Sequence, residues 1–219
     1  MLSHMPPNRP AKTEAMRSEA SRMGFLLAGG KSSRMGADKA FVDFGGQTLL
    51  DRALHAMSAV CGRVVIVGDP AKFINCGSAK YESVVADIFA GCGPLGGIHT
   101  ALVHSSAELN LMLAVDMPLV SAELLAFLFA AAENTDAVIT VPRIRGGFQP
   151  LCAVYRRDFC AVAEQALRAG KYKIDATFSG ARIRVIEEEE LAAGGFTERS
   201  FFNVNTPQDR REGEGRPFS

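Results

Sequence analysis

The sequence predicts an α/β fold of three layers, α/β/α, in which a mainly parallel sheet lies between two sets of helices. Two observations support this prediction. Short runs of consecutive apolar residues recur along the chain, and stretches with apolar residues at helical spacing separate them. Strands without polar alternation are typical of sheets that helices cover on both faces, and such sheets are mainly parallel.

The first half of the chain shows this alternation most regularly. A strand is expected at 24–28, followed by a helix from Thr48 and a strand at 63–67, which together form a β-α-β unit. The pattern repeats with strands at 83–86 and 111–115, which enclose a glycine-rich loop and a helix. The core faces of the two helices carry Leu50, Ala53, Leu54 and Met57, and then Ile98, Ala101 and Leu102.

The second half continues the pattern. Ser121 is expected to cap a helix that carries Leu124, Leu125, Leu128 and Phe129. Further strands are expected at 137–141, 150–155, 182–186 and near Phe201. One more helix is expected to carry Phe159, Ala163, Ala166 and Leu167.

A single domain is expected over residues 23–210. Residues 1–22 have no apolar segment and are rich in proline, serine and charge, so a disordered tail is expected there rather than a signal peptide. Residues 211–219 are expected to form a flexible C-terminal tail.

Charge and cysteine content exclude several classes of protein. Lys plus Arg and Asp plus Glu number 24 each, so no overall field would draw the chain to nucleic acid or to an anionic membrane. The 5 cysteines are odd in number and form no C-x-x-C pair, which argues against a disulfide framework or a zinc site. The longest apolar run, at 124–132, is too short to span a bilayer. A cytoplasmic protein is therefore expected.

The stretch GFLLAGGKSSRMGADK, at 24–39, has the chemistry of an anion-binding loop. It lacks the opening glycine of a P-loop, and the adjacent Gly29 and Gly30 do not fit G-x-G-x-x-G. Glycines still let backbone N–H groups approach an anion. Positive charge around that anion can come from Lys31, Arg34 and Lys39. The alternative is an ordinary glycine-rich turn with solvated basic residues.

Three loops are expected to meet at one edge of the sheet. The glycine-rich loop follows the first strand, Asp87 follows the strand at 83–86, and Asp116 follows the strand at 111–115. In parallel sheets ligands bind beyond the carboxyl ends of the strands. An anion cradle, carboxylates that can hold Mg²⁺ and a lysine are what phosphoryl or nucleotidyl transfer requires. The alternative for each aspartate is a simple turn or cap residue.

The segment LAGGKSSRMGADK, at 27–39, resembles the signature L-A-G-G-x-S-x-R-M-G-x-x-K of the molybdenum cofactor guanylyltransferases, which attach GMP to molybdopterin. This likeness implies a Rossmann-like nucleotidyltransferase fold. It extends in order through GPLGG at 93–97, DMP at 116–118, FQPLCAVY at 148–155 and FFNVNTPQD at 201–209.

The resemblance also implies residue roles. The nucleotide would be bound by Leu27, Ala28, Gly29, Gly30, Lys39, Asp87 and Asp116. Within this set, Lys39 would contact the phosphates, Asp87 the nucleoside and Asp116 the Mg²⁺. Arg34 would be a further phosphate ligand, and Lys39, Asp116 and Arg34 would be the catalytic residues.

The reaction implied by the resemblance transfers GMP from GTP to the terminal phosphate of molybdopterin and releases pyrophosphate, with Mg²⁺ as cofactor. The acceptor phosphate is already an anion, so no general base is needed. Two segments are candidates for the pterin, RIRGGFQP with Arg143 and Arg145, and NVNTP at 203–207, each with a plain basic loop or turn as the alternative. Transient contact with molybdenum cofactor enzymes or their chaperones is also expected.

Two other functions remain open. A related enzyme would use CTP, on molybdopterin or on a sugar or polyol phosphate, although cytidylyl relatives tend to have alanine where this chain has Gly29. The other is a non-catalytic adaptor that retains the fold. The chain also departs from the family after the strand at 63–67, where Gly68 and Asp69 replace an asparagine that members can carry.

Overall fold

The structure is a computed structural model that describes residues 21–29, 38–74, 76 and 80–215. Its strands are β1 (Arg22–Leu27), β2 (Asp43–Phe44), β3 (Gln47–Thr48), β4 (Arg63–Val67), β5 (Ser83–Val85), β6 (Leu109–Ala114), β7 (Ile139–Ile144), β8 (Gly147–Phe148), β9 (Cys152–Arg156) and β10 (Ile183–Ile186). Its α-helices are α2 (Leu49–Ser58), α3 (Pro70–Phe73), α4 (Pro94–His104), α5 (Ala122–Glu133), α6 (Phe159–Arg168), α7 (Glu188–Ala193) and α8 (Pro207–Glu214). Short 3-10 helices are η1 (Lys39–Phe41), η2 (Asp175–Thr177) and η3 (Glu198–Phe201).

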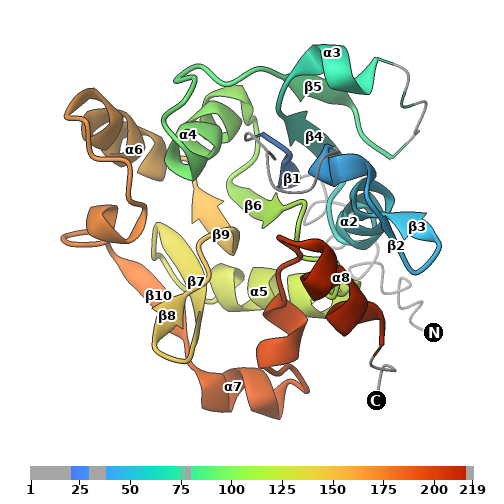
Figure 1. The fold of residues 1–219 in the computed structure, drawn as a ribbon. Helices are drawn as coiled ribbons and strands as arrows, with labels where there is room; N and C mark the ends of the chain where they lie inside the picture. The colour runs from blue at the N-terminus through green and yellow to red at the C-terminus, as the bar shows by residue number, and fades with distance from the viewer. Residues whose placement is uncertain (1–20, 30–37, 75, 77–79, 216–219) are drawn as a thin grey trace, which may run out of the picture.

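The main sheet has the strand order β10-β7-β9-β6-β1-β4-β5, with β8 beside β7 (Figure 1). Strand β1 pairs in parallel with both β4 and β6, and β5 continues this parallel half. Strand β9 runs antiparallel to both of its neighbours, β6 and β7. The prediction of an α/β fold with a mainly parallel sheet is confirmed; β9 and the short β8, which runs antiparallel to β7, are the exceptions.

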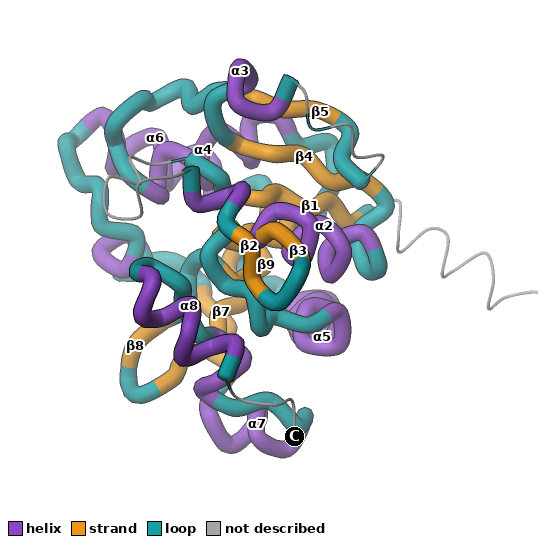
Figure 2. Tube along the Cα trace, turned by 45° about the vertical axis from the view of Figure 1, so that its right-hand side comes forward, coloured by secondary structure: helices purple, strands orange, loops and turns teal. Residues whose placement is uncertain are grey.

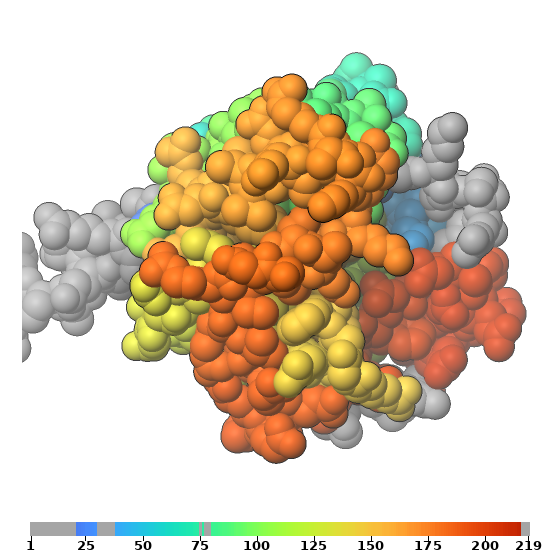
Figure 3. Space-filling view, turned by 90° about the vertical axis from the view of Figure 1, so that its left-hand side faces the viewer, coloured from blue at the N-terminus to red at the C-terminus, as the bar shows by residue number. Residues whose placement is uncertain are grey.

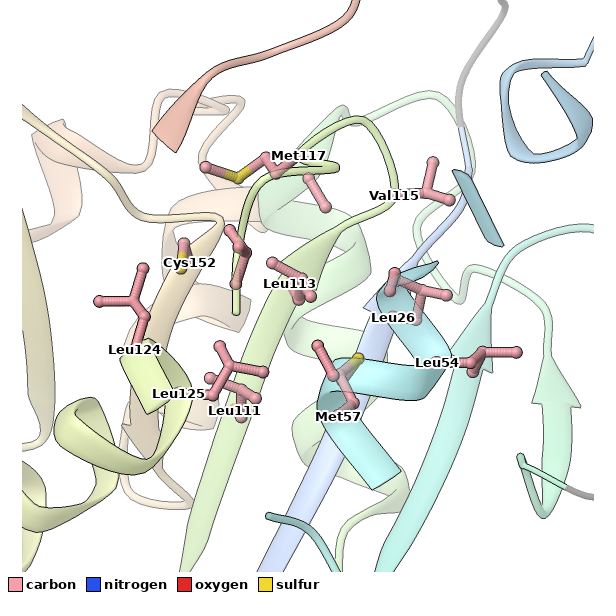
Figure 4. Packing of buried hydrophobic residues seen from close by; sticks show 14 of the residues in the cluster. Leu26, Leu54, Met57, Leu111, Leu113, Val115, Met117, Leu124, Leu125 and Cys152 are labelled. Atoms are coloured by element: carbon pink, nitrogen blue, oxygen red, sulfur yellow. The ribbon is translucent and has the colours of Figure 1, made fainter. Parts of the chain in front are cut away.

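Helices cover both faces of the sheet because successive side chains of a buried strand point to opposite sides. In β1, Leu26 packs with α2 and α5 on one face, whereas Met23 and Phe25 pack with α4 and α6 on the other. Figure 4 shows the first of these layers, in which Leu54 and Met57 of α2 and Leu124 and Leu125 of α5 lie against the sheet.

The cap expected at Ser121 is present, and Thr48, where a helix is expected to begin, also caps one. The Thr48 hydroxyl accepts a hydrogen bond from the Asp51 backbone N–H at 3.0 Å, and α2 begins at the next residue. The Ser121 hydroxyl accepts one from the Leu124 N–H at 3.3 Å, and α5 begins at Ala122. Each cap satisfies a backbone donor that has no partner within its helix.

Two expectations for the C-terminal region are corrected. The prediction of a strand near Phe201 is wrong. This segment forms η3, which begins at a reciprocal cap between Thr197 and Ser200. Helix α8 continues to Glu214, beyond the domain end expected at residue 210. The disordered tail expected at 1–22 lies outside the described residues except for its last two, and Arg22 already belongs to β1.

The β2–β3 hairpin and α8 are elements that the sequence analysis did not identify. They lie next to each other (Figure 2), and their contact is tight because Gly213 of α8 faces the ring of Phe44. Figure 3 shows α8 and the segment before it, in red, beside the face that the second half of the chain forms. No helix in the described part of the chain is long and apolar enough to cross a membrane.

Candidate active site

A cavity of about 720 Å³ opens where β1, β4 and β6 end. The loop before α4 and the first turn of α4 complete its wall. It is lined by Leu27, Ala28, Gly29, Asp38, Lys39, Val67, Asp87, Gly91, Gly93, Pro94, Gly97, Ala114, Val115, Asp116 and Leu151. The structure thus brings the three expected loops to one edge of the sheet, as the parallel direction of their strands requires.

Hydrogen bonds beyond the regular ladder hold these strand ends together. The Ala28 N–H donates to the Val67 carbonyl at 2.9 Å, and the Val115 N–H donates to the Leu27 carbonyl at 3.2 Å. The chain therefore remains fixed for one residue beyond β1 and β6. Asp116 and Gly29 begin their loops from these fixed positions.

Asp87 lies between two glycines. A Cβ atom on Gly29 would stand 3.3 Å from Asp87 Oδ2, and one on Gly97 would stand 3.7 Å from Asp87 Oδ1. Any side chain at position 29 would therefore crowd this carboxylate. Both glycines and Asp87 line the cavity.

The Asp87 carboxylate is poorly solvated. Burial raises its pKa above the usual range of a carboxyl group. Its Oδ1 atom is buried and has no hydrogen-bond partner among the described residues. A buried acceptor of this kind is costly unless it is paired, so Asp87 is suited to accept a hydrogen bond from a ligand.

Lys39 is positioned by the cap of η1. The Asp38 side chain accepts a hydrogen bond from the Ala40 N–H at 3.2 Å, and Ala40 is fully buried. Asp38 also forms an ion pair of 2.6 Å with Lys72 of α3. The Lys39 side chain therefore starts from an anchored turn and reaches into the cavity.

Lys39 binds two acceptors that are distant in sequence. Its Nζ atom donates to Asp116 Oδ2 at 2.8 Å and to Asn205 Oδ1 at 2.7 Å. An ammonium group has three N–H donors, so one remains for a ligand. In Asp116 the second oxygen, Oδ1, is buried and has no partner within the described part of the chain.

The donor set at Asp116 fits Mg²⁺. This ion prefers oxygen ligands, commonly takes one or two protein carboxylates, and completes its shell with water and substrate phosphates. The buried Oδ1 of Asp116, which has no partner among the described residues, is an oxygen that could serve as such a ligand. Among the described residues no group of three or more His, Cys, Asp or Glu side chains could hold a metal, and Mg²⁺ does not require one.

The N-terminus of α4 also faces the cavity. A Cβ atom on Gly96 would lie 2.9 Å from the Phe89 carbonyl oxygen, so the loop before α4 packs directly on the first turn of this helix. Gly93, at φ 69°, precedes Pro94, the first residue of α4, and both line the cavity. Free N–H groups and the helix dipole favour an anion at this place.

The residues that the sequence analysis selected are largely found together. Cavity-lining residues that were selected are Leu27, Ala28, Gly29, Lys39, Asp87 and Asp116. Gly30, Lys31 and Arg34 lie outside the described residues. The phosphate contacts expected of these three remain predictions.

The two arginines expected at the pterin, Arg143 and Arg145, form ion pairs outside the cavity lining. Arg143 pairs with Glu187 at 2.5 Å, and Arg145, in the β7–β8 turn, pairs with Glu198 at 2.6 Å. Neither lines the cavity. The cavity-lining residue nearest to these arginines in sequence is Leu151, whose carbonyl accepts a hydrogen bond from the Ala114 N–H at 2.8 Å.

Sequence reasoning missed the direct contact between Asn205 and Lys39. It placed the NVNTP segment near the pterin, whereas the structure places Asn205 against the lysine. A signal was available in Thr206, which starts a T-x-x-D capping box with Asp209 and thereby begins α8. The lining role of Asp38 was also missed.

Comparison with known proteins shows the family to which the chain belongs. Residues 24–183 match the family described as MobA-like NTP transferase domain. The probable molybdenum cofactor guanylyltransferase of Pelotomaculum thermopropionicum is 37% identical over 186 residues, which cover 85% of this chain and 88% of the relative. The molybdenum cofactor guanylyltransferase of Desulfosudis oleivorans is 34% identical over 194 residues, which cover 87% and 93%.

Solved structures show the same relationship. Molybdopterin-guanine dinucleotide biosynthesis protein A from Archaeoglobus fulgidus is similar with a TM-score of 0.76 and 28% identity, over 88% of this chain and 97% of that one. The fold is shared with 2-C-methyl-D-erythritol 4-phosphate cytidylyltransferase from Thermus thermophilus, at a TM-score of 0.64 and 20% identity over 87% and 96%. The chain therefore belongs to the MobA-like NTP transferase family and is a nucleotidyltransferase.

Proposed function

We propose that the protein transfers GMP from GTP to the terminal phosphate of molybdopterin, in a reaction that requires Mg²⁺. The products are molybdopterin guanine dinucleotide and pyrophosphate. The names of the relatives support the choice of nucleotide and acceptor. The observation that carries the proposal is the ion pair between Lys39 and Asp116 at the cavity. Within the described structure, Lys39 keeps one N–H donor and Asp116 keeps its Oδ1 oxygen for a ligand.

The chain's own residues bind and align the nucleotide. The backbone at Leu27, Ala28 and Gly29 lies against the guanine nucleotide, and Asp87 accepts a hydrogen bond from the nucleoside. The remaining N–H of Lys39 donates to a phosphate oxygen. Gly30 and Arg34, which lie outside the described residues, are further proposed phosphate ligands.

The transfer itself needs little more than alignment. An oxygen of the acceptor phosphate attacks the α-phosphorus of GTP, and the bond from that phosphorus to the β-phosphate oxygen breaks, so pyrophosphate leaves in line. Lys39 stabilises the negative charge that the two substrates bring together. Asp116 Oδ1 would hold Mg²⁺, which when bound offsets further phosphate charge.

A transfer assay tests this proposal. Purified protein is incubated with molybdopterin and with GTP that is radiolabelled at its α-phosphate, with and without Mg²⁺. We expect a labelled dinucleotide only when Mg²⁺ is present. Lys39→Ala should lower the rate by about 10²-fold or more through lost charge stabilisation. The matched control is Lys173→Ala, which removes an exposed lysine outside the cavity lining.

The other outcomes of this assay identify the alternatives. Labelled product from CTP and none from GTP would assign a cytidylyltransferase. No product from either nucleotide would support an adaptor that retains the fold. Binding of the pterin by RIRGGFQP or near 203–207, contact with molybdenum cofactor enzymes or their chaperones, and a cytoplasmic location remain predictions.

A further inference from the structure

Lys39 depends on a segment that lies far from it in sequence. Asn205 is the second acceptor of the Lys39 ammonium group, at 2.7 Å. With Asp116 on one side and Asn205 on the other, the ammonium group is held between two acceptors. The position of Asn205 therefore affects the position of the Lys39 charge.

The backbone around Asn205 is fixed on both sides. The Val204 N–H donates to the Asp116 carbonyl at 2.8 Å, and the Val204 side chain is fully buried. The next two N–H groups, of Asn205 and Thr206, both donate to Asp209 Oδ2 at 2.8 Å. Asp209 thus binds the residue that binds Lys39.

Asp209 has the charge that this role requires. It lies in the first turn of α8, where a negative charge is favourable, and completes the capping box with Thr206. The hydrogen bond from the Asn205 backbone is the largest of several causes that lower the pKa of Asp209. Its side chain is therefore a carboxylate at neutral pH.

Helix α8 is in turn docked on the segment that carries Lys39. A Cβ atom on Gly213 would lie 2.8 Å from the Phe44 ring, so the helix backbone packs directly on the β2–β3 hairpin. The Gly45 N–H donates to Glu214 at 3.0 Å, and Arg210 forms an ion pair with Asp43 at 3.0 Å. Figure 1 shows α8 beside this hairpin, which follows η1 in the chain.

We propose that Asp209 is a positioning residue for Lys39, which it fixes through the backbone and side chain of Asn205. Helix α8 is then part of the active site even though none of its residues lines the cavity. This inference rests on the proposed function for its effect on transfer. The contacts themselves are present in the protein without a nucleotide.

A double-mutant cycle between Asp209 and Lys39 tests the inference. Asp209→Ala should lower kcat for transfer by about 5–10-fold in the wild-type background and less than about 2-fold in the Lys39→Ala background, because no positioned ammonium group remains. Asp209→Asn keeps an acceptor oxygen for the two N–H groups and should restore most of the rate. Arg210→Ala is the matched control, since it weakens α8 docking without touching the Asp209 bonds.

A second arm of the cycle needs no nucleotide. The wild type, Asp209→Ala, Lys39→Ala and the double variant are unfolded in urea. Asp209→Ala should lower the midpoint of unfolding less when Lys39 is already alanine. If wild-type protein transfers neither nucleotide, the proposed function fails and the urea cycle alone decides the positioning role. Equal effects of Asp209→Ala in both backgrounds, in rate or in urea midpoint, would overturn the inference, as would an equal loss of rate in Arg210→Ala.

Discussion

Asp116 has one carboxylate oxygen paired with Lys39 and one that is buried without a partner in the described structure. Replacing it with asparagine preserves the shape and removes the charge. We expect Asp116→Asn to lower transfer by about 10²–10³-fold, which corresponds to a barrier increase of about 2.7–4 kcal/mol. The measurement is turnover as a function of Mg²⁺ concentration, together with a melting curve.

The control for this variant is Asp136→Asn, which makes the same change at an exposed carboxylate. It should leave both turnover and Mg²⁺ dependence as in the wild type. If Asp116→Asn turned over normally at saturating Mg²⁺ with an unchanged Mg²⁺ requirement, Asp116 would be only a turn residue.

Asp87 gives a prediction about pH. Because burial raises its folded-state pKa, the stability linked to this group is complete below the unfolded-state pKa and is lost as pH rises through the folded-state pKa. Asparagine carries no charge at any pH. We therefore expect Asp87→Asn to melt at a higher temperature than wild type at neutral pH, and the difference to shrink as the pH falls toward the ordinary carboxyl pKa.

Melting curves of both proteins over this pH range, without nucleotide, provide the measurement. Asp136→Asn again serves as the control, because its carboxylate is exposed and pairs with Arg182. If the melting temperature of Asp87→Asn exceeded that of the wild type by the same amount at every pH, the charge of Asp87 would not be the cause of the difference.

The residues of the site could be selected from the sequence because their backbone context is simple. Asp87 and Asp116 each follow an apolar strand, and Gly29 follows another, so the topology of a parallel sheet places them together. Asn205 could not be assigned to Lys39 in the same way. Their contact depends on how α8 docks on a hairpin, and neither element has a strong apolar pattern.

Among the elements, the direction of β9 was the main feature that the sequence left undetermined. A strand that is buried on both faces reads as a continuous apolar run whether it runs parallel or antiparallel, so 150–155 gave no sign of its reversal. Helix α8, PQDRREGE, is polar on all sides and buries only Gly213. Periodicity therefore could not reveal it, and only its capping box could.

Gly213 gives a prediction for α8. In an isolated helix, alanine would be favoured over glycine by about 1 kcal/mol, but here its Cβ would lie 2.8 Å from the buried Phe44 ring. Overpacking of this kind costs about 1–3 kcal/mol. We expect Gly213→Ala to lose about 1–2 kcal/mol of unfolding free energy in urea titration.

Gln208→Ala, at an exposed position of the same helix, should change stability by less than about 0.5 kcal/mol. A Gly213→Ala protein that was as stable as wild type would show that α8 can shift away from the hairpin at no cost. The close contact would then not determine where α8 lies.

For the molecule as a whole, the choice of nucleotide is the central prediction. By resemblance, Gly29 favours GTP where cytidylyl relatives have alanine, and a Cβ at this position would crowd Asp87. We expect calorimetry with Mg²⁺ present to show GTP binding at least tenfold tighter than CTP, a difference of about 1.4 kcal/mol. Equal affinities would remove the guanylyl assignment and leave the fold unaffected.

The reversed strand also affects how the protein is synthesised. A nascent chain that has left the ribosome as far as Ala114 can complete the parallel half of the sheet, in the order β6-β1-β4-β5. The outer edge of β6 then has no partner until β9 emerges, which takes roughly 2–8 s at about 5–20 residues per second. Every residue of β6 is buried in the finished protein. During this interval its unpaired backbone edge is exposed and can pair with strands of other chains. Any ribosome pause between Ala114 and Arg156 lengthens that exposure.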